Sequence, residues 1–242
     1  MGRLLFLLYS VMIASSLSAY DFPAPGGKIT ASFGSGEKGQ FNTGVDIQTE
    51  NVFASEEGEV LYYSPDFIAL AHDDSLLTLY SQVAASDEIS KDIHIKKGQL
   101  LGKTKGGVLN FAIYDLEMER YINPLLMTDN IKKSELPKVS GLSYDPEGML
   151  TVYMSSKGLL GLYKVQISVG GQVVGTLGFR TVQKKGDTLV LDKEAFEYGT
   201  LYGRDGAFTF PGIHLNPGDN SVDVIVTDFY GKKVVFHGRI TV

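Results

Sequence analysis

This chain has few candidate nucleophiles, metal ligands or acid–base residues, and their spacing does not match an established catalytic motif. There is no cysteine, which excludes a thiol nucleophile and a cysteine-ligated metal site. The sequence has neither a Gly-x-Ser-x-Gly nucleophile turn nor a Gly-rich phosphate-binding loop. The four histidines lack the His-x-His or His-x-x-x-Asp spacing that brings metal ligands together, and we expect ordinary surface or strand-end residues. They are His72, His94, His214 and His237.

Two pairs of adjacent acidic residues, Glu56-Glu57 and Asp73-Asp74, are the remaining candidates for acid–base chemistry. A glycosidase needs two carboxylates that face each other across a cleft. Neighbouring residues on a strand point to opposite faces of a sheet, so neither pair can face a common cleft within a strand. The pairs therefore predict solvated turns.

The composition of the 242 residues is that of a packed globular protein, with 43% hydrophobic and 21% charged residues. The formal net charge is -6 and no cluster of Lys and Arg is present, which argues against a nucleic-acid partner. Residues 1–136 carry 11 basic and 18 acidic side chains, whereas residues 137–242 carry 11 and 10. This shift predicts a domain boundary near Pro137.

The first residues have the features of an export signal. Arg3 precedes an apolar run from Leu4 to Ile13, and small residues follow up to Ala19. The run is shorter than the roughly 20 residues that span a bilayer, which favours a cleaved signal over a membrane anchor. We predict a signal peptide at residues 1–19, an exported protein of the periplasm or cell surface, and no transmembrane segment after cleavage.

The mature chain has the pattern of two β domains. Between Lys28 and Met127, short apolar runs alternate with glycine-rich turn signals, which is the spacing of strands and not of helices. The polar stretch 128–138 contains Pro137 and predicts a linker. Seven candidate strands follow, the number expected of an immunoglobulin-like sandwich, which predicts such a domain at 139–242. These strands are 150–154, 162–168, 172–179, 188–191, 207–210, 221–227 and 233–242.

Six short motifs between Ile29 and Met127 follow one another in the order found in lysostaphin-type (LytM-like) peptidoglycan metalloendopeptidases, and the chain resembles this family there. The resemblance implies an all-β fold with a lysostaphin-type sheet domain, a duplicated hybrid motif, at residues 20–127. The motifs are Ser32-Phe33-Gly34, Gly44-Val45-Asp46-Ile47, Ala54 with Gly58-Glu59-Val60, Thr78-Leu79-Tyr80, Lys97-Gly98-Gln99-Leu100-Leu101-Gly102 and Asn123-Pro124.

In the resembled family, histidines and one aspartate hold zinc and act on the attacking water. The resemblance places Asn42 at the first ligand histidine and keeps Asp46 as the aspartate. It places Val108 and Asn110 at the His-x-His pair and Gln82 at the remaining catalytic histidine. Amide oxygens are poor zinc ligands, valine cannot ligate or transfer a proton, and calcium requires six to eight oxygens. We therefore expect no cofactor, no metal and no catalytic residue, but a polar cluster in a degenerate active-site cleft.

Tyr114 and Tyr121 flank this cleft and are candidates for stacking on a sugar ring, although alternating aromatic residues more often belong to a core. Histidine-free members of the resembled family act by binding. The leading prediction is therefore a non-catalytic cell-envelope protein that binds peptidoglycan or regulates a cell-wall hydrolase. The alternatives are an active zinc metalloendopeptidase that cleaves peptidoglycan cross-bridges and a structural or adhesive surface protein.

Overall fold

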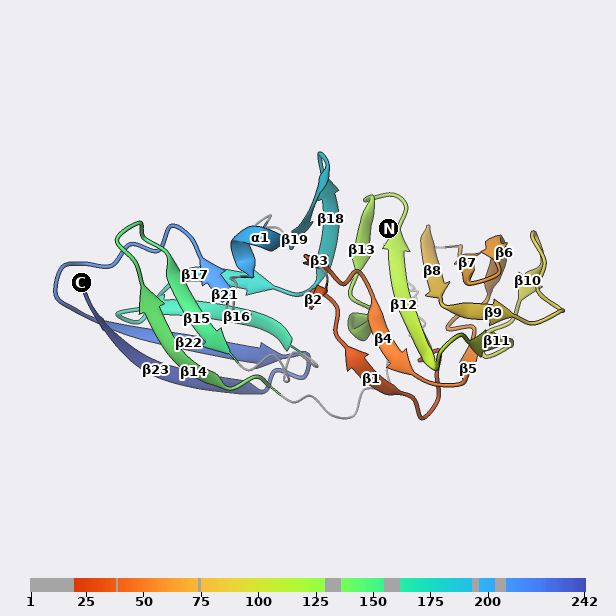
Figure 1. The fold of residues 1–242 in the computed structure, drawn as a ribbon, viewed down its shortest axis with the longest axis horizontal. Coiled ribbons are helices and arrows are strands. Elements are labelled where there is room, and N and C mark those ends of the chain that lie inside the picture. Colours follow the sequence, from red (N-terminus) through yellow and green to blue (C-terminus); the bar gives the residue numbers. More distant parts are fainter. Residues whose placement is uncertain are drawn as a thin grey trace, which may run out of the picture.

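A computed structural model describes residues 20–37, 39–73, 75–128, 136–154, 162–192, 196–202 and 208–242. The predicted signal peptide and most of the predicted linker, residues 129–135, lie outside the described residues. Within the described ranges the chain is almost entirely β-structure, with one 3-10 helix and one short α-helix (Figure 1). The prediction of an all-β fold is confirmed.

The elements follow one another along the chain as β1 (Lys28–Ala31), β2 (Gly36–Glu37), β3 (Gln40–Phe41), β4 (Val45–Gln48), β5 (Asn51–Phe53), β6 (Gly58–Ser64), β7 (Phe67–Ala71), β8 (Leu76–Ser81), β9 (Val83–Ala85), β10 (His94–Ile95), β11 (Leu100–Thr104), β12 (Val108–Asp115), β13 (Arg120–Ile122), η1 (Pro124–Leu126), β14 (Val139–Tyr144), β15 (Leu150–Met154), β16 (Leu162–Val169), β17 (Gln172–Gly178), β18 (Thr181–Lys185), β19 (Thr188–Leu191), β20 (Phe196–Glu197), α1 (Tyr198–Leu201), β21 (Phe208–Phe210), β22 (Asp219–Asp228) and β23 (Lys233–Thr241).

One large antiparallel sheet organises the first half of the protein. Its strands run in the order β10-β6-β7-β8-β12-β13-β18-β19-β20, and β4 joins β12 and carries β1 (Figure 1). Alternation along β12 sends Leu109, Phe111 and Ile113 to one face, where all three are fully buried. The small sheet β5-β11-β9 adds Val52 and Leu101 to the same core. The opposite face of the large sheet is therefore the one that can carry a site.

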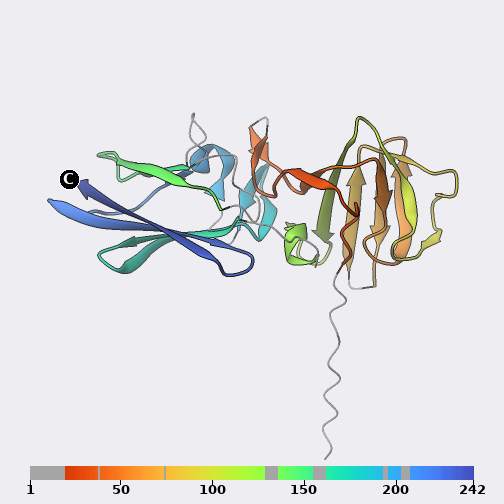
Figure 2. The ribbon, with the colours of Figure 1, turned by 90° about the horizontal axis from the view of Figure 1, so that it is seen from below.

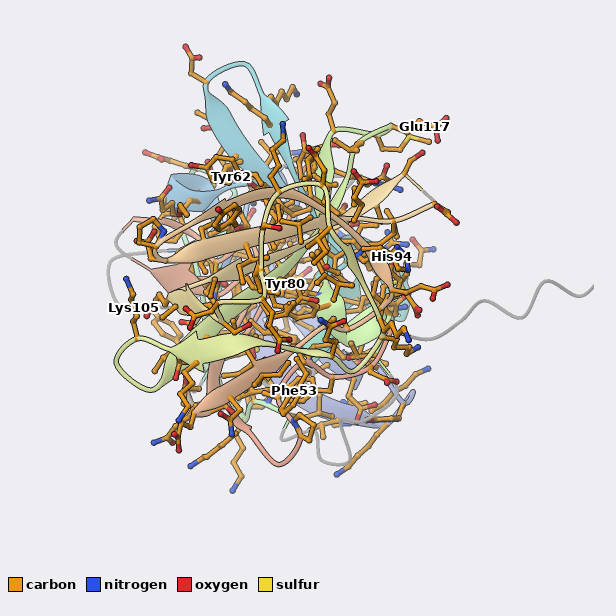
Figure 3. All side chains as sticks on the ribbon, turned by 90° about the vertical axis from the view of Figure 1, so that its right-hand side faces the viewer. Phe53, Tyr62, Tyr80, His94, Lys105 and Glu117 are labelled. Carbon is orange, nitrogen blue, oxygen red and sulfur yellow. The ribbon has the colours of Figure 1, made fainter. Side chains whose placement is uncertain are left out.

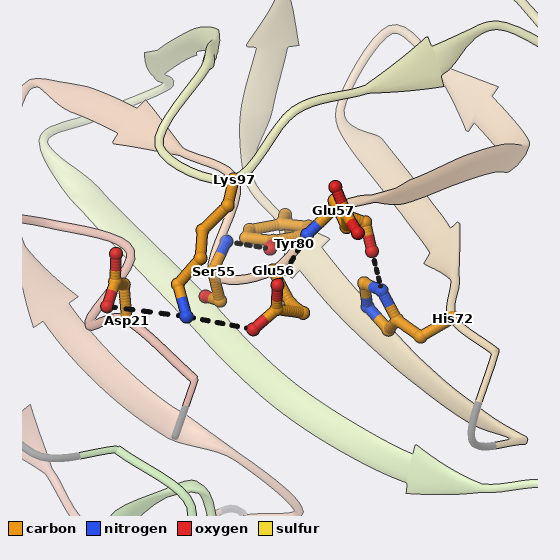
Figure 4. Close-up of polar contacts among 7 residues, drawn as sticks. All are labelled: Asp21, Ser55, Glu56, Glu57, His72, Tyr80 and Lys97. Carbon is orange, nitrogen blue, oxygen red and sulfur yellow. Dashed lines mark hydrogen bonds and ion pairs between the residues drawn. The ribbon is translucent and has the colours of Figure 1, made fainter. Parts of the chain in front are cut away.

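The Lys97-Gly98-Gln99 turn fixes the small sheet to the strands beside it. Gly98 has a positive φ of 73°, and its N–H donates to the carbonyl of Ala54 over 2.8 Å. The Lys97 ammonium lies 2.8 Å from Glu56 Oε2 and 3.6 Å from Asp21 Oδ1 (Figure 4). This turn thus links β11 both to the segment before β6 and to the start of the described chain.

The C-terminal half contains two further sheets, β14-β15-β21 and β17-β16-β22-β23 (Figure 2). Val152, Phe208, Val165 and Val224 are buried and come from both sheets. Six of the seven predicted strands overlap strands of these two sheets, but Thr188–Leu191 does not. This strand, β19, belongs to the large sheet instead, and β14 is a strand that the sequence pattern did not predict.

The large sheet crosses the predicted linker. β13 pairs with β18 through Tyr121 opposite Val182, so residues from both halves of the chain share one hydrogen-bonded ladder. Asn123 reinforces this junction, because its side-chain amide donates to the carbonyl of Phe179 over 2.7 Å and its backbone N–H donates to Arg180 over 2.8 Å. Residues 179–192 and 196–202 therefore pack with the first half, while the predicted boundary at 128–138 stays a prediction.

Candidate functional site

Three of the predicted cleft residues form one hydrogen-bonded cluster on the open face of the large sheet. Asn110 on β12 lies directly opposite Asp46 on β4, so both side chains project from the same face. The Asn110 Nδ2 atom lies 2.6 Å from Asp46 Oδ1 and 3.3 Å from Asn42 Oδ1. We call Asn42, Asp46 and Asn110 the polar cluster.

The backbone after β3 holds Asn42 in a single orientation. The N–H of Gly44 donates to Asn42 Oδ1 over 3.0 Å, which identifies this atom as the acceptor and Nδ2 as the donor. A side chain at Gly44 would collide with the carbonyl of Phe111, so only glycine allows this close approach. The Asn42 side chain is 6% exposed, and its Nδ2 has no hydrogen-bond partner within the described part of the chain. The cluster therefore contains one unsatisfied donor.

The other two residues of the predicted cleft take no part in these hydrogen bonds. Val108 is half-buried and lies opposite Gln48, on the same face as Asn110. Gln82 is exposed, with a positive φ of 65°, and its backbone joins Asp66 and Lys105. Ser81, not Gln82, lies opposite Asn110. The structure therefore brings together Asn42, Asp46 and Asn110, with Val108 beside them and Gln82 just past the end of β8.

The two candidate stacking tyrosines face each other. Tyr114 and Tyr121 are opposite residues on β12 and β13, and their rings meet edge to face with centroids 5.0 Å apart. Burial, and then the neighbouring Tyr114, raise the pKa of the Tyr121 hydroxyl above its ordinary value. Part of each ring is thus occupied by the other tyrosine.

Ser81 and Phe67 lie on the same face, and sequence reasoning did not include them, while Tyr62 also lies on that face. The register runs from Asn110 to Ser81 on β8 and on to Phe67 on β7. Tyr62 on β6 is opposite Ala69, and its ring centroid lies 6.0 Å from that of Phe67. Strand pairing is the signal that would have identified these residues, and a single sequence does not reveal it.

His72 is bound into the structure on the other side of the sheet. Its Nδ1 lies 2.6 Å from the carbonyl of Glu57 and must donate, since a carbonyl only accepts (Figure 4). Its Nε2 lies 2.9 Å from Thr78 Oγ1, and the ring meets Tyr20 edge to face. These contacts give His72 a structural role at the end of β7.

Several solved structures are similar to part of this chain. Csd3 of Helicobacter pylori is 23% identical with a TM-score of 0.40, and the match covers 51% of this chain and 35% of Csd3. A zinc-containing peptidase from Vibrio cholerae is 18% identical with a TM-score of 0.39, covering 47% of this chain and 40% of the peptidase. A chain from the SpoIIIAH–SpoIIQ complex is 18% identical with a TM-score of 0.38, covering 44% of this chain and 97% of its own. No curated protein matches the chain.

The fold and the cluster define an all-β protein that carries a hydrogen-bonded Asn-Asp-Asn group on one sheet face. A protein-family model matches residues 120–242, half of the chain, and the chain belongs to that family. The matched region begins at the first residue of β13, the strand that pairs with β18. In the part of the chain that the structure describes, no helix is long and apolar enough to cross a membrane.

The polar cluster does not fit the zinc ion of the family that the sequence resembles. A zinc site needs imidazole, thiolate or carboxylate donors around one point. Here an amide N–H, which carries partial positive charge, points at the Asp46 carboxylate over 2.6 Å. Elsewhere in the described ranges, no three His, Cys, Asp or Glu side chains come together as a metal-binding group.

Proposed function

We propose that this protein is a non-catalytic binding protein of the cell envelope whose peptidase-like first domain binds peptidoglycan or regulates a cell-wall hydrolase. The observation that carries the proposal is the hydrogen bond from Asn110 Nδ2 to Asp46 Oδ1. An uncharged donor therefore lies against the carboxylate that the family resemblance assigns to the metal. The sheet that presents these residues is held by strand pairing and core packing.

The cluster presents groups suited to binding a neutral polar ligand. Asp46 supplies carboxylate oxygens, and Asn42 Nδ2 supplies a buried donor without a partner among the described residues. A buried donor without an acceptor costs about 1–3 kcal/mol, which a ligand carbonyl or hydroxyl would recover. Peptide bonds and sugar hydroxyls both offer such acceptors, and both occur in peptidoglycan.

The experiment combines a binding assay with a metal measurement on the purified chain. The protein is incubated with protein-free peptidoglycan and, separately, with a purified envelope hydrolase whose activity is followed. We expect binding to one of them and weaker binding by Asn110→Leu, which removes the hydrogen bonds to Asp46 and Asn42. Asn51→Leu, at an exposed position on β5, is the matched control.

Two outcomes would overturn the proposal. Stoichiometric zinc in the purified protein, together with cleavage of peptidoglycan cross-bridges that a chelator abolishes, would identify a working metalloendopeptidase. Absence of binding to both peptidoglycan and hydrolase would favour a structural or adhesive surface protein.

A further inference from the structure

The outer edge of β6 is open over half of its length. β6 pairs with β7 along one side, from Glu59 to Ser64. On its other side β10 reaches only Gly58 and Glu59, and the loop before β10 reaches Val60. Beyond Val60 no strand of the described structure pairs with this edge. Residues 61–64 therefore present a free row of backbone donors and acceptors.

The side chains on this open edge are unusually apolar. Leu61, Tyr62 and Tyr63 are consecutive and are 48%, 56% and 43% exposed. Natural proteins protect exposed sheet edges with lysine, proline, bulges or covering loops, because an apolar edge pairs with other chains. The register of β6 with β7 shifts between Val60 and Tyr62, which is one such bulge, and Pro65 follows the end of β6. Even so, the open edge carries three large apolar side chains and no charged one. Such a combination marks a site at which another strand binds.

This edge is continuous with the face that bears the polar cluster. Tyr62 points to that face and packs against Phe67, and Figure 3 shows Tyr62 on the side of the molecule formed by the β6 end of the sheet. A strand added to β6 would place alternate side chains against Tyr62 and Phe67 and leave the others beside Tyr63. The edge thus provides both backbone pairing and an aromatic contact surface.

The charges around the edge indicate what kind of strand fits. The exposed side chains of Glu57, Glu59 and Asp66 bracket β6, and residues 56–66 contain no Lys or Arg. On the segment beside the start of this edge, Lys91 lies 4.0 Å from Asp92, and Lys96 is exposed. Carboxylates around the edge therefore outnumber ammonium groups. An incoming strand that carries basic side chains is attracted by these carboxylates, and an acidic strand is repelled. We propose that the β6 edge binds an extended segment of a partner protein, rich in Lys or Arg and in apolar residues, as an added strand. This interaction does not depend on which ligand the polar cluster takes.

The test uses the full chain and a short fluorescein-labelled peptide of alternating lysine and valine, followed by fluorescence anisotropy. Two comparison peptides are used. The first has glutamate in place of lysine, and the second has the lysine sequence with alternate backbone nitrogens methylated. We expect binding of the lysine peptide only, with slowed hydrogen exchange at residues 61–64. The double variant Tyr62→Ser and Tyr63→Lys should bind about tenfold more weakly or worse. The matched control is Val234→Ser with Val235→Lys on β23, where the two side chains are 39% and 43% exposed.

The comparison of peptides on the unmodified protein keeps the test decisive if a variant fails to fold. Equal binding of the methylated peptide would overturn the proposal, because backbone pairing would then play no part. Equal loss of binding in the β23 control would overturn it as well. Concentration-dependent dimerisation that the β6 variant abolishes would assign the edge to a second copy of the chain. Retention on protein-free glycan that the variant loses would assign it to sugar stacking.

Discussion

At the scale of single residues, the short contact between Asn110 and Asp46 decides which chemistry the open sheet face allows. A carboxylate in this position either faces a cation or accepts a hydrogen bond, and here the donor is the Asn110 amide. Because Asn42 Oδ1 accepts from both Gly44 and Asn110, the three side chains form one network with a defined direction of donation. Two residue-scale predictions follow from that direction.

Asn110→Asp should destabilise the protein at neutral pH. The change places a second carboxylate about 3 Å from Asp46, and two like charges at that distance raise the pKa of one of them. When the pKa of a carboxyl group is higher in the folded than in the unfolded state, the free energy of unfolding of the protein falls as the pH rises through the folded pKa. We expect a deficit of about 1–3 kcal/mol at pH 7 that disappears below about pH 4, measured by urea denaturation across this range.

The control for this prediction is Asn51→Asp, at an exposed position on β5. It adds the same charge without a facing carboxylate, so its stability should follow that of the parent protein at each pH. A pH-independent deficit in Asn110→Asp would contradict the orientation described for the cluster. Samples with and without calcium should be compared, since a recovery of the stability of Asn110→Asp by calcium would reveal an oxygen-lined cation site.

The double variant Asn42→His with Asn110→His should acquire zinc binding. These substitutions put two imidazoles beside Asp46, which gives the three protein ligands that a catalytic-type zinc site requires. Equilibrium dialysis with elemental analysis should give about one zinc per chain, and each single variant should bind far more weakly. Zinc binding by neither variant, in a folded protein, would show that the aligned positions do not converge on one point.

The sequence identified Asn42, Asp46 and Asn110 through their positions relative to short motifs, and the register of β4 with β12 brings them into contact. It did not identify Ser81 or Phe67, because a single sequence does not reveal which strands pair. Gln82 was assigned to the cleft from its place after Tyr80. A positive φ at Gln82 turns the chain away from β8 before the side chain could reach Asn110, and that turn has no signature in the residue type.

At the scale of elements, the Lys97-Gly98-Gln99 turn combines a tight bend with an ion pair. Burial disfavours the charged form of Lys97, but its hydrogen bond to Glu56 and the charges of Glu56 and Asp21 outweigh that effect and raise the pKa of the ammonium. The turn should therefore hold the small sheet best while Lys97 is charged.

Lys97→Met should lower stability by about 1 kcal/mol at neutral pH, since the partly buried Glu56 loses its cation. A lysine whose pKa is raised by folding stabilises the native state below its unfolded value of 10.5, and this contribution is lost as the pH rises through the folded pKa. The difference between parent and variant should therefore narrow above pH 10.5. Thermal midpoints from neutral to alkaline pH measure it, with Lys91→Met, whose ion pair is exposed, as control.

Element type was predictable from the sequence, but sheet membership was not. Alternating apolar residues and glycine turns indicate strands because only a two-residue period puts apolar side chains on one buried face. Thr188–Leu191 shows the limit of this reasoning. Its consecutive residues Val190 and Leu191 point to opposite faces and are both fully buried, and β19 pairs with β18 and β20 in the large sheet. β19 joins the large sheet because its neighbour β18 pairs with β13, a strand of the first half of the chain. The residues of β19 alone do not reveal this pairing.

At the scale of the whole molecule, residues 179–192 and 196–202 connect the two halves of the chain. Tyr202 donates its hydroxyl proton to the carbonyl of Gly34 over 2.6 Å, and its ring lies 6.0 Å from that of Phe41. Burial, and then the charge of Tyr198, raise the pKa of the Tyr202 hydroxyl. These contacts reach the β2–β3 hairpin, which leads directly into Asn42. The hydrogen bond and the ring contact of Tyr202 thus connect residues on either side of the predicted boundary near Pro137.

Asn123→Ala should weaken the junction and the stability of both halves. Asn123 is 1% exposed, and its side chain donates a hydrogen bond to the carbonyl of Phe179 and accepts one from the N–H of Leu125. The substitution therefore leaves two buried backbone groups without these hydrogen bonds. We expect a cost of about 2–4 kcal/mol and a single unfolding transition in the parent protein. Hydrogen exchange should report faster opening in both β4 and β22. Faster opening confined to one half would contradict a shared cooperative unit, and Asn51→Ala is the exposed control.

The hydrogen-bonded pair of β13 and β18 also affects the distance between ligands bound to different parts of the protein. Two domains on a flexible tether sample many separations, and a ligand held by one raises the local concentration for the other only on average. A hydrogen-bonded strand pair allows no such swivelling. The Asn42 face and β18, which belong to one sheet, are therefore held at one separation and angle. Two ligands, one at the Asn42 face and one beside β18, would therefore be kept at a set distance from each other.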